Sequence, residues 1–235
     1  MNNIMQGDKS EKCTESRLKT IYKKLSKRYS PCNWWPAESS FEVIVGAILT
    51  QNTSWQNVEK ALDNLKKICI LEPENIAALS EDELANAIRP SGFYKRKAHT
   101  IKTFVEFHKY KYNYNINNID KVSLDIIRKE LLCIKGIGDE TADCILLYAF
   151  NKPTFVVDAY TKRILTRAGI IENSVTNELL KANIENALQK DVFMYNEFHA
   201  LFVNLGKEHC RRNPKCENCP INDVCLHYKK SNRDT

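Results

Sequence analysis

The sequence predicts an all-α fold, and three observations support this prediction. The 235 residues include only seven glycines and seven prolines, whereas proteins contain on average roughly 7% glycine and 5% proline. A β-sandwich or barrel needs many tight turns and could hardly be built from so few. Apolar residues recur at helical spacing along most of the chain, and only residues 154–157 have an extended pattern. The periodicity therefore predicts roughly ten helices joined by short polar loops.

The predicted helices follow one another in the order of their apolar stripes. The stripes cover residues 18–25, 58–65, 84–88, 98–108, 124–131, 142–149, 164–168, 180–188 and 198–205. Ser80 and Glu83 have the spacing of a capping box, which predicts a helix start just after Ser80. The longest apolar stretch, Phe41 to Leu49, is interrupted by Glu42 and falls far short of the roughly 18 residues that a membrane span needs.

Residues 1–15 are polar and lack the apolar core of a signal peptide. We therefore expect a disordered tail there, in a soluble and cytoplasmic protein that contacts no membrane. In such a reducing compartment, the nine cysteines indicate metal binding or catalysis more than disulfides. Five are scattered and are expected to act as small hydrophobes or incidental thiols. They are Cys13, Cys32, Cys69, Cys133 and Cys144.

The other four cysteines crowd into sixteen residues, with the spacing Cys210-x5-Cys216-x2-Cys219-x5-Cys225. Four thiolates can hold either an iron–sulfur cluster or a zinc ion. Zinc sites more often use two Cys-x2-Cys pairs, and here there is one such pair. The spacing therefore favours a cluster and leaves zinc as the rival. His209 and His227 flank the set and are expected at the surface.

Positive charge is concentrated between Arg89 and Lys111, where seven basic residues stand against one acidic residue. The rest of the chain is neutral, although the formal net charge of the whole is +6. Such a run can be a solvated helix face or a surface that faces phosphates.

Two helical patterns flank the segment Ile134-Lys135-Gly136-Ile137-Gly138-Asp139. A Gly-x-Gly turn bends the chain tightly and exposes backbone N–H groups at the start of the second helix, where they suit a phosphate oxygen. A plain helix–turn–helix corner is the alternative.

Eighteen residues after Glu140 comes Val156-Val157-Asp158-Ala159-Tyr160. Asp158 precedes a helical pattern, so it can be an ordinary N-cap. The combination, however, resembles the helix-hairpin-helix DNA glycosylase superfamily that includes endonuclease III. There, the pattern Leu-Pro-Gly-Val-Gly-x-Lys-Thr-Ala is followed at this distance by Val-Val-Asp, and four cysteines close the chain. The resemblance runs from about Phe41 to Cys225.

The resemblance implies an enzyme with two helical domains and a C-terminal loop that binds a 4Fe-4S cluster. It implies a barrel domain over residues 41–150 that ends in the hairpin at 123–150, and a second domain made of 16–40 with 151–228. Asp158 would be the catalytic carboxylate that stabilises positive charge on the sugar. Glu140 is the second candidate for the catalytic site, where it either helps or merely replaces a lysine. Bifunctional members carry a lysine where this chain has Glu140, so an intact abasic site and no strand cleavage are expected.

Upstream segments are more similar to the 3-methyladenine DNA glycosylase III branch. They are Cys32-Asn-Trp-Trp-Pro36, Ile48-Leu-Thr-Gln-Asn-Thr-Ser-Trp55 and Arg89-Pro-Ser-Gly-Phe-Tyr94. The expected substrate is an alkylated purine, whose positive charge attracts it to indole rings. The base pocket implied by this branch consists of Trp34, Trp35, Pro36, Trp55 and Lys207. The tryptophans can instead be core residues, and Lys207 an ordinary surface lysine.

The expected partner is double-stranded DNA with a flipped damaged base, bound by a monomer associated with the nucleoid. By resemblance, Gln51 would fill the gap left by the flipped base and Phe93, after Gly92, would form the opposing wedge. The hairpin would bind the backbone through Lys135, Gly136 and Gly138. Two alternatives stay open: an endonuclease III-like enzyme acting on oxidised, deaminated or mismatched bases, and a non-catalytic iron–sulfur protein that binds DNA.

Overall fold

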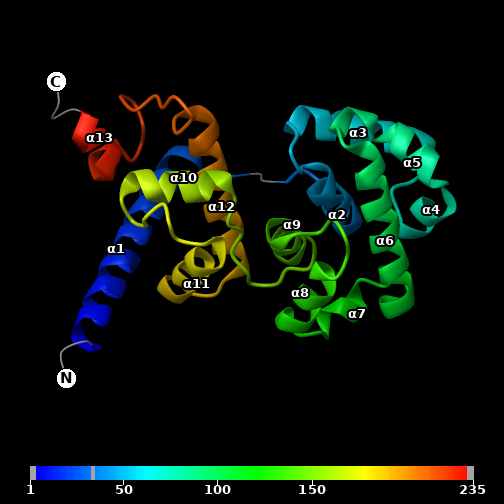
Figure 1. Cartoon of the computed structure of the whole chain (residues 1–235), viewed down its shortest axis with the longest axis horizontal. Coiled ribbons are helices and arrows are strands. Elements are labelled where there is room, and N and C mark those ends of the chain that lie inside the picture. The colour runs from blue at the N-terminus through cyan, green and yellow to red at the C-terminus, as the bar shows by residue number, and fades with distance from the viewer. Residues whose placement is uncertain (1–3, 33–34, 232–235) are drawn as a thin grey trace. The chain divides into compact units, whose positions relative to one another are not determined.

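The computed structural model describes residues 4–32 and 35–231, and the chain divides into two compact units (Figure 1). One unit is Trp35–Lys152, and the other joins Met1–Trp34 to Pro153–Thr235. The described residues are helical and contain no β-strand, which confirms the predicted fold class. Residues 154–157 are buried but form no strand.

The Trp35–Lys152 unit is built around α2 (Ser40–Leu49), a helix whose residues from Phe41 onward are all buried. A helix that is apolar on all sides belongs in a core. The helices around it are α3 (Trp55–Ile68), α4 (Pro73–Ala78), α5 (Glu81–Ala87), α6 (Tyr94–Tyr112), α7 (Asn117–Asp120), α8 (Leu124–Leu132) and α9 (Asp139–Cys144), with the short turns η1 (Arg89–Ser91) and η2 (Ile145–Ala149).

Local sequence signals explain several of these helix boundaries. Ser80 and Glu83 form the predicted capping box, with the Ser80 N–H donating to Glu83 at 2.8 Å and the Glu83 N–H donating to Ser80 at 3.2 Å. Glu42 is buried near the start of α2, where its carboxylate pairs with Lys66 at 2.8 Å. The pairing keeps a buried charge satisfied.

The second unit contains α1 (Ile4–Tyr29), α10 (Ala159–Ala168), α11 (Asn177–Ala187), α12 (Val192–Glu208), η3 (Asn222–Val224) and α13 (Leu226–Ser231). Helix α12 forms its centre and packs against α1 and α10. The ring of Phe198 on α12 stacks on that of Phe202, with the ring centroids 4.4 Å apart, and meets Tyr22 of α1 edge-on. These aromatic contacts hold α1 against α12.

The domain limits differ from those expected at three places. Residues 4–15, expected as a separate tail, are part of α1, a helix that packs through the buried Leu18, Ile21 and Leu25. Residues 35–40 join the unit expected to begin at 41, because Trp35 packs within that unit against Gly46 and Tyr148. The same unit extends to Lys152, whose backbone N–H bonds to Leu146.

Candidate functional site

Asp158 lies at the N-terminus of α10 and is buried. Its backbone is extended, and its Oδ1 accepts a 2.7 Å hydrogen bond from the backbone N–H of Thr161. Asp158 is therefore the N-cap of α10, one of the two roles suggested by its sequence. The cap fixes the rotamer of the carboxylate and leaves Oδ2 for a second partner.

That second partner is His199 on α12, a residue that the sequence analysis missed. Its Nε2 lies 3.6 Å from Asp158 Oδ2, and the two side chains are only 5% and 10% exposed. Burial by itself raises the pKa of Asp158, but contact with His199 and the N–H of Thr161 outweigh it, so the pKa lies below its ordinary value. The site therefore holds a buried carboxylate in its ionised form.

The hairpin connects α8 to α9 and is exposed at Lys135, Gly136, Gly138 and Glu140. Ile134 and Ile137 are each 5% exposed and pack between the helices, as their spacing suggests. Arg128 of α8 bonds to Asp139 at 2.7 Å and to Asp143 at 2.8 Å, both on α9. These charge-assisted bonds fix the two helices relative to each other.

Gln51 contacts this hairpin directly. Its Nε2 donates to the carbonyl oxygen of Gly136 at 2.9 Å and to Oγ1 of Thr141 at 3.0 Å. The structure thus brings together residues of two predicted DNA-contacting motifs that are separated by 85 positions.

Gly136 adopts a φ of +101°, and a Cβ there would lie 2.1 Å from Oγ1 of Thr100. Both the left-handed backbone and the close approach require glycine. We expect Gly136→Ala to lower the free energy of unfolding by about 1–3 kcal/mol, measured by chemical denaturation. Gly138→Ala is the comparison variant, because a Cβ at Gly138 meets nothing within 4 Å and only the smaller cost of replacing the N-cap glycine of α9 is expected. Equal losses of stability in the two variants would contradict this account.

A turn formed by η1, Gly92 and Phe93 precedes α6. Gly92 and Phe93 both have left-handed backbones, with φ of +67° and +47°, and the Phe93 side chain is 62% exposed. Arg96 lies over its ring, with 5.3 Å between the guanidinium carbon and the ring centroid. A large apolar side chain is thus held out in solvent next to a cation.

Two of the seven basic residues in the run 89–111 do not form a surface for phosphates, which corrects part of that prediction. Lys97 is 1% exposed and donates to the carbonyls of Leu49 and Ser91. Lys102 donates to the carbonyls of Ile76, Ala77 and Leu79. Sequence alone cannot distinguish a lysine that caps backbone carbonyls from one that is solvated. Arg89, Lys95, Arg96, Lys109 and Lys111 remain for the predicted surface.

Three half-buried aromatic rings gather at Trp35, Trp55 and Tyr148. Trp35 stacks on Tyr148 with a centroid distance of 5.1 Å and meets Trp55 edge-on at 5.6 Å. Pro36 is exposed, and the predicted Trp34 lies outside the described residues. Tyr148 was missed because its contact with Trp35 joins segments 113 positions apart in the sequence. It stands on η2, a π-helical turn, and such turns are frequent at functional sites.

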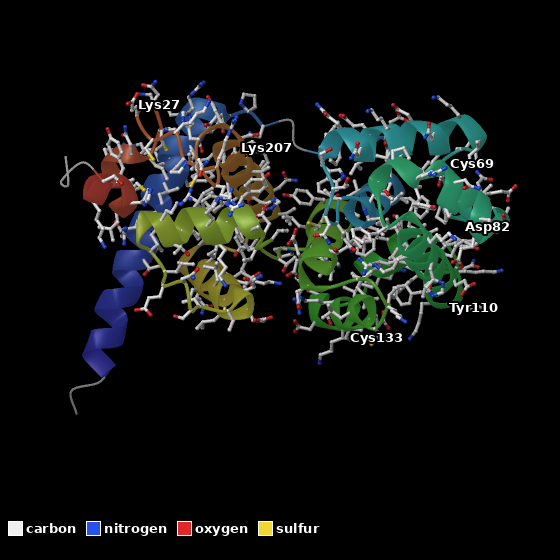
Figure 2. The ribbon with its side chains drawn as sticks, turned by 45° about the horizontal axis from the view of Figure 1, so that its top comes forward. Lys27, Cys69, Asp82, Tyr110, Cys133 and Lys207 are labelled. Carbon is white, nitrogen blue, oxygen red and sulfur yellow. The ribbon has the colours of Figure 1, made fainter. Side chains whose placement is uncertain are left out.

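Lys207 is exposed near the end of α12 (Figure 2). The preceding Gly206 lets α10 approach α12, because a Cβ there would lie 2.1 Å from the ring of Tyr160. Lys207 belongs to the other unit than Trp35 and Trp55, so its place in a base pocket stays a prediction.

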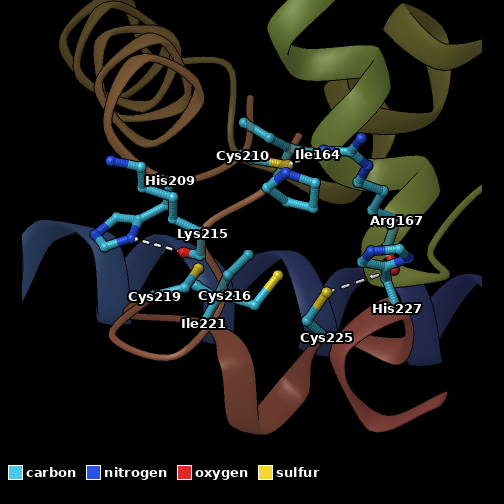
Figure 3. A pocket seen from close by; sticks show the side chains of 11 residues that line it. Ile164, Arg167, His209, Cys210, Lys215, Cys216, Cys219, Ile221, Cys225 and His227 are labelled. Atoms are coloured by element: carbon cyan, nitrogen blue, oxygen red, sulfur yellow. Dashed lines mark hydrogen bonds between the residues drawn. The ribbon is translucent and has the colours of Figure 1, made fainter. Parts of the chain in front are cut away.

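The four clustered cysteines line one pocket that also includes Ile164, Arg167, His209 and Ile221 (Figure 3). His209 is buried and bonds through Nδ1 to the carbonyl of Lys215 at 3.0 Å. This corrects its expected surface position: the imidazole closes the loop by satisfying a backbone carbonyl.

The donor set fits a four-iron cluster, because four cysteine side chains line one pocket. A 4Fe-4S cluster takes one thiolate on each iron. Burial raises the pKa of Cys216, and that of Cys219 to about 11, so thiolates there depend on a bound cation.

The cysteine loop is anchored to α10, the helix that Asp158 caps. Arg163 donates to the carbonyl of Cys210 at 2.7 Å, and Arg167 donates to those of Arg211 and Arg212 at 2.6 and 3.0 Å. The side chains of Arg211, Arg212 and Lys215 are exposed. One helix therefore carries the buried carboxylate at its start and the cysteine loop along its side.

The model of the HhH-GPD superfamily of base excision DNA repair proteins matches residues 45–190. The chain belongs to this superfamily. The model of the iron-sulfur binding domain of endonuclease III also matches, over residues 211–225. The chain is therefore a DNA glycosylase of base excision repair that binds DNA and holds a 4Fe-4S cluster, which confirms the predicted cofactor.

Individual HhH-GPD proteins resemble this chain over most of its length. A Methanocaldococcus jannaschii protein assigned as a DNA repair glycosylase is 49% identical over 208 residues, covering 88% of this chain and 94% of its own. The H. pylori 3-methyladenine DNA glycosylase bound to 1,N6-ethenoadenine is 32% identical, with a TM-score of 0.68 over 83% of this chain and 97% of that one. A non-covalent endonuclease III–DNA complex, 23% identical, shares the fold with a TM-score of 0.80 over 93% and 98%.

Across the described part of this HhH-GPD chain, none of the helices combines the length and the apolar character needed to cross a bilayer.

Proposed function

We propose that this enzyme hydrolyses the N-glycosidic bond of alkylated purines such as 3-methyladenine in double-stranded DNA. The observation that carries the proposal is the cluster of Trp35, Trp55 and Tyr148, in which one indole and one phenol stack and a second indole stands at an angle. The likeness to the H. pylori 3-methyladenine enzyme, at 32% identity, supports it.

The aromatic cluster suits a cationic base. A 3-methylated adenine carries positive charge, and a cation on the face of an indole gains about 0.5–2 kcal/mol, most where water is excluded. The three rings are half-buried, so a base could reach them while the surrounding protein partly shields them from water. Because a charged base is already a good leaving group, little general acid catalysis is needed, and the carboxylate of Asp158 would stabilise the positive charge left on the sugar.

The enzyme is proposed to leave an intact abasic site. Glu140 stands in the hairpin at the position of the lysine that attacks the sugar in bifunctional relatives, and a carboxylate cannot form an imine. Glu140 is exposed at the start of α9, where the helix N-terminus favours a negative charge. The fold can therefore accommodate the negative charge of Glu140 at this position whether or not Glu140 takes part in catalysis.

The duplex would be opened by Gln51 and Phe93, in a monomer that flips the damaged base. The exposure of Phe93 and its left-handed backbone support the wedge, since an apolar side chain inserted into a base step offsets part of the unstacking energy. Gln51 lies at the hairpin, beside the backbone groups proposed to bind phosphate.

A panel of duplexes with single lesions tests the proposal. We expect excision of 3-methyladenine or its ethenoadenine analogue, strand breaks only after alkali, and no covalent adduct on borohydride treatment. The controls are duplexes with thymine glycol, uracil or a thymine–guanine mismatch. Strand cleavage without alkali, or a trapped adduct, would overturn the monofunctional assignment, and excision restricted to a control lesion would overturn the alkylpurine assignment.

The alternative substrate class is an oxidised, deaminated or mismatched base. Relatives named endonuclease III, from Thermotoga maritima at 29% identity, and thymine-DNA glycosylase, from Aeropyrum pernix at 24%, favour it. The same panel separates the two classes. A chain that binds all duplexes and excises nothing would instead be a non-catalytic DNA-binding protein.

A further inference from the structure

Lys97 connects two turns that are far apart in the sequence. Its Nζ donates to the carbonyl of Leu49 at 2.8 Å and to that of Ser91 at 2.7 Å, and the side chain is 1% exposed. Burial and the nearby Arg96 lower the pKa of Lys97 to about 8. A buried lysine is costly unless its donors are satisfied, so this one indicates a specific structural use.

Both carbonyls stand just before the residues proposed to open the duplex. Leu49 ends α2 two residues before Gln51, and Ser91 ends η1 two residues before Phe93. At Leu49 the ammonium also meets the negative end of a helix dipole, which strengthens the contact. One cation thus fixes the base of both turns.

We propose that Lys97 is a positioning residue for duplex opening. Its ammonium group holds the Gln51 turn and the Phe93 turn at a fixed separation, so that the gap filler and the wedge enter the duplex together. The inference rests on the roles assigned to these two residues in the proposed function. It adds a residue that never touches DNA and acts only through the backbone of the two turns.

Lys102 provides a matched control on the same helix. Its Nζ donates to the carbonyls of Ile76, Ala77 and Leu79 at 3.2, 2.8 and 2.6 Å, at the end of α4. Lys102→Met therefore removes the same kind of cap as Lys97→Met, but away from both turns. A purely structural role of Lys97 would make the two variants behave alike.

The test compares excision of the lesion in two duplexes under single-turnover conditions. In one the lesion is paired, and in the other it faces a one-nucleotide gap, so that no base pair must be opened. We expect Lys97→Met to excise the paired lesion about 10-fold more slowly or worse, since two bonds from a charged donor are lost. It should regain nearly wild-type rates on the gapped duplex, and Lys102→Met should show no such difference between substrates.

The inference would be overturned if the excision rate of Lys97→Met, divided by that of the wild type, were the same on the paired and the gapped duplex. If the wild type excises no lesion, the proposed function fails instead. The fluorescence of 2-aminopurine placed beside the lesion then measures opening of the duplex in the absence of excision. A difference between Lys97→Met and Lys102→Met in that signal supports the inference, and its absence refutes it. If Lys97→Met does not fold, Lys97→Gln replaces it in the same comparisons.

Discussion

Replacing Asp158 with asparagine is expected to slow excision at least about 100-fold while leaving DNA binding intact. The substitution removes the negative charge but keeps the shape and the acceptor oxygen for the N–H of Thr161, and asparagine caps helices about as well as aspartate. Stability should therefore change little. Single-turnover excision measures the rate, and fluorescence anisotropy with the same lesion duplex measures binding.

The pH dependence of the wild type provides a second readout of the same carboxylate. Its folded pKa lies below the ordinary value, so the ionised form persists to lower pH, and activity should decline only as the pH falls through that lowered pKa. His199→Gln removes the imidazole whose Nε2 lies 3.6 Å from Asp158 Oδ2 and that helps to lower the pKa of Asp158, so the acid limb of the pH–rate profile should move to higher pH. An Asp158→Asn enzyme with near wild-type rates would show that another group stabilises the transition state.

The fold class could be predicted from the sequence because it depends on local patterns. Helical periodicity and the capping box at Ser80 act over a few residues, and the structure has both where they were expected. The N-cap role of Asp158 was readable for the same reason. The cysteine spacing predicted a four-thiolate site, because a short loop brings its own ligands together, and the resemblance to endonuclease III favoured a 4Fe-4S cluster over zinc.

The parts that could not be predicted depend on contacts between distant segments. His199 is 41 positions from Asp158, and nothing in the sequence pattern of an apolar helix predicts that its histidine contacts a carboxylate. Lys97 looks like any lysine in a basic run until two remote carbonyls are seen to share it. Tyr148 falls within the helical pattern of residues 142–149, but its stacking on the distant Trp35 is visible only in the folded chain.

Replacing Cys219 with alanine is expected to remove the iron and the visible absorption of the cluster and to destabilise the protein strongly. The loop would lose a ligand in a pocket that otherwise contains little besides cysteines and a few apolar and basic side chains. Loss of a structural metal site is among the few changes that cost more than about 4 kcal/mol of unfolding free energy. Iron content, absorption spectra and denaturation measure these effects.

The consequences of the Cys219→Ala substitution should extend to Asp158 through α10. Arg163 and Arg167 bind three carbonyls of the cysteine loop, so a disordered loop releases the helix that positions the carboxylate. Excision should then fall together with binding, unlike in Asp158→Asn, where binding survives. Cys133→Ala is the control, because Cys133 is exposed and outside the loop, and its unfolding free energy should change by less than about 0.5 kcal/mol. A Cys219→Ala protein that retains its full iron content would mean that another side chain completes the cluster. The buried His209 lines the same pocket, so it would be the first residue to substitute in a search for that ligand.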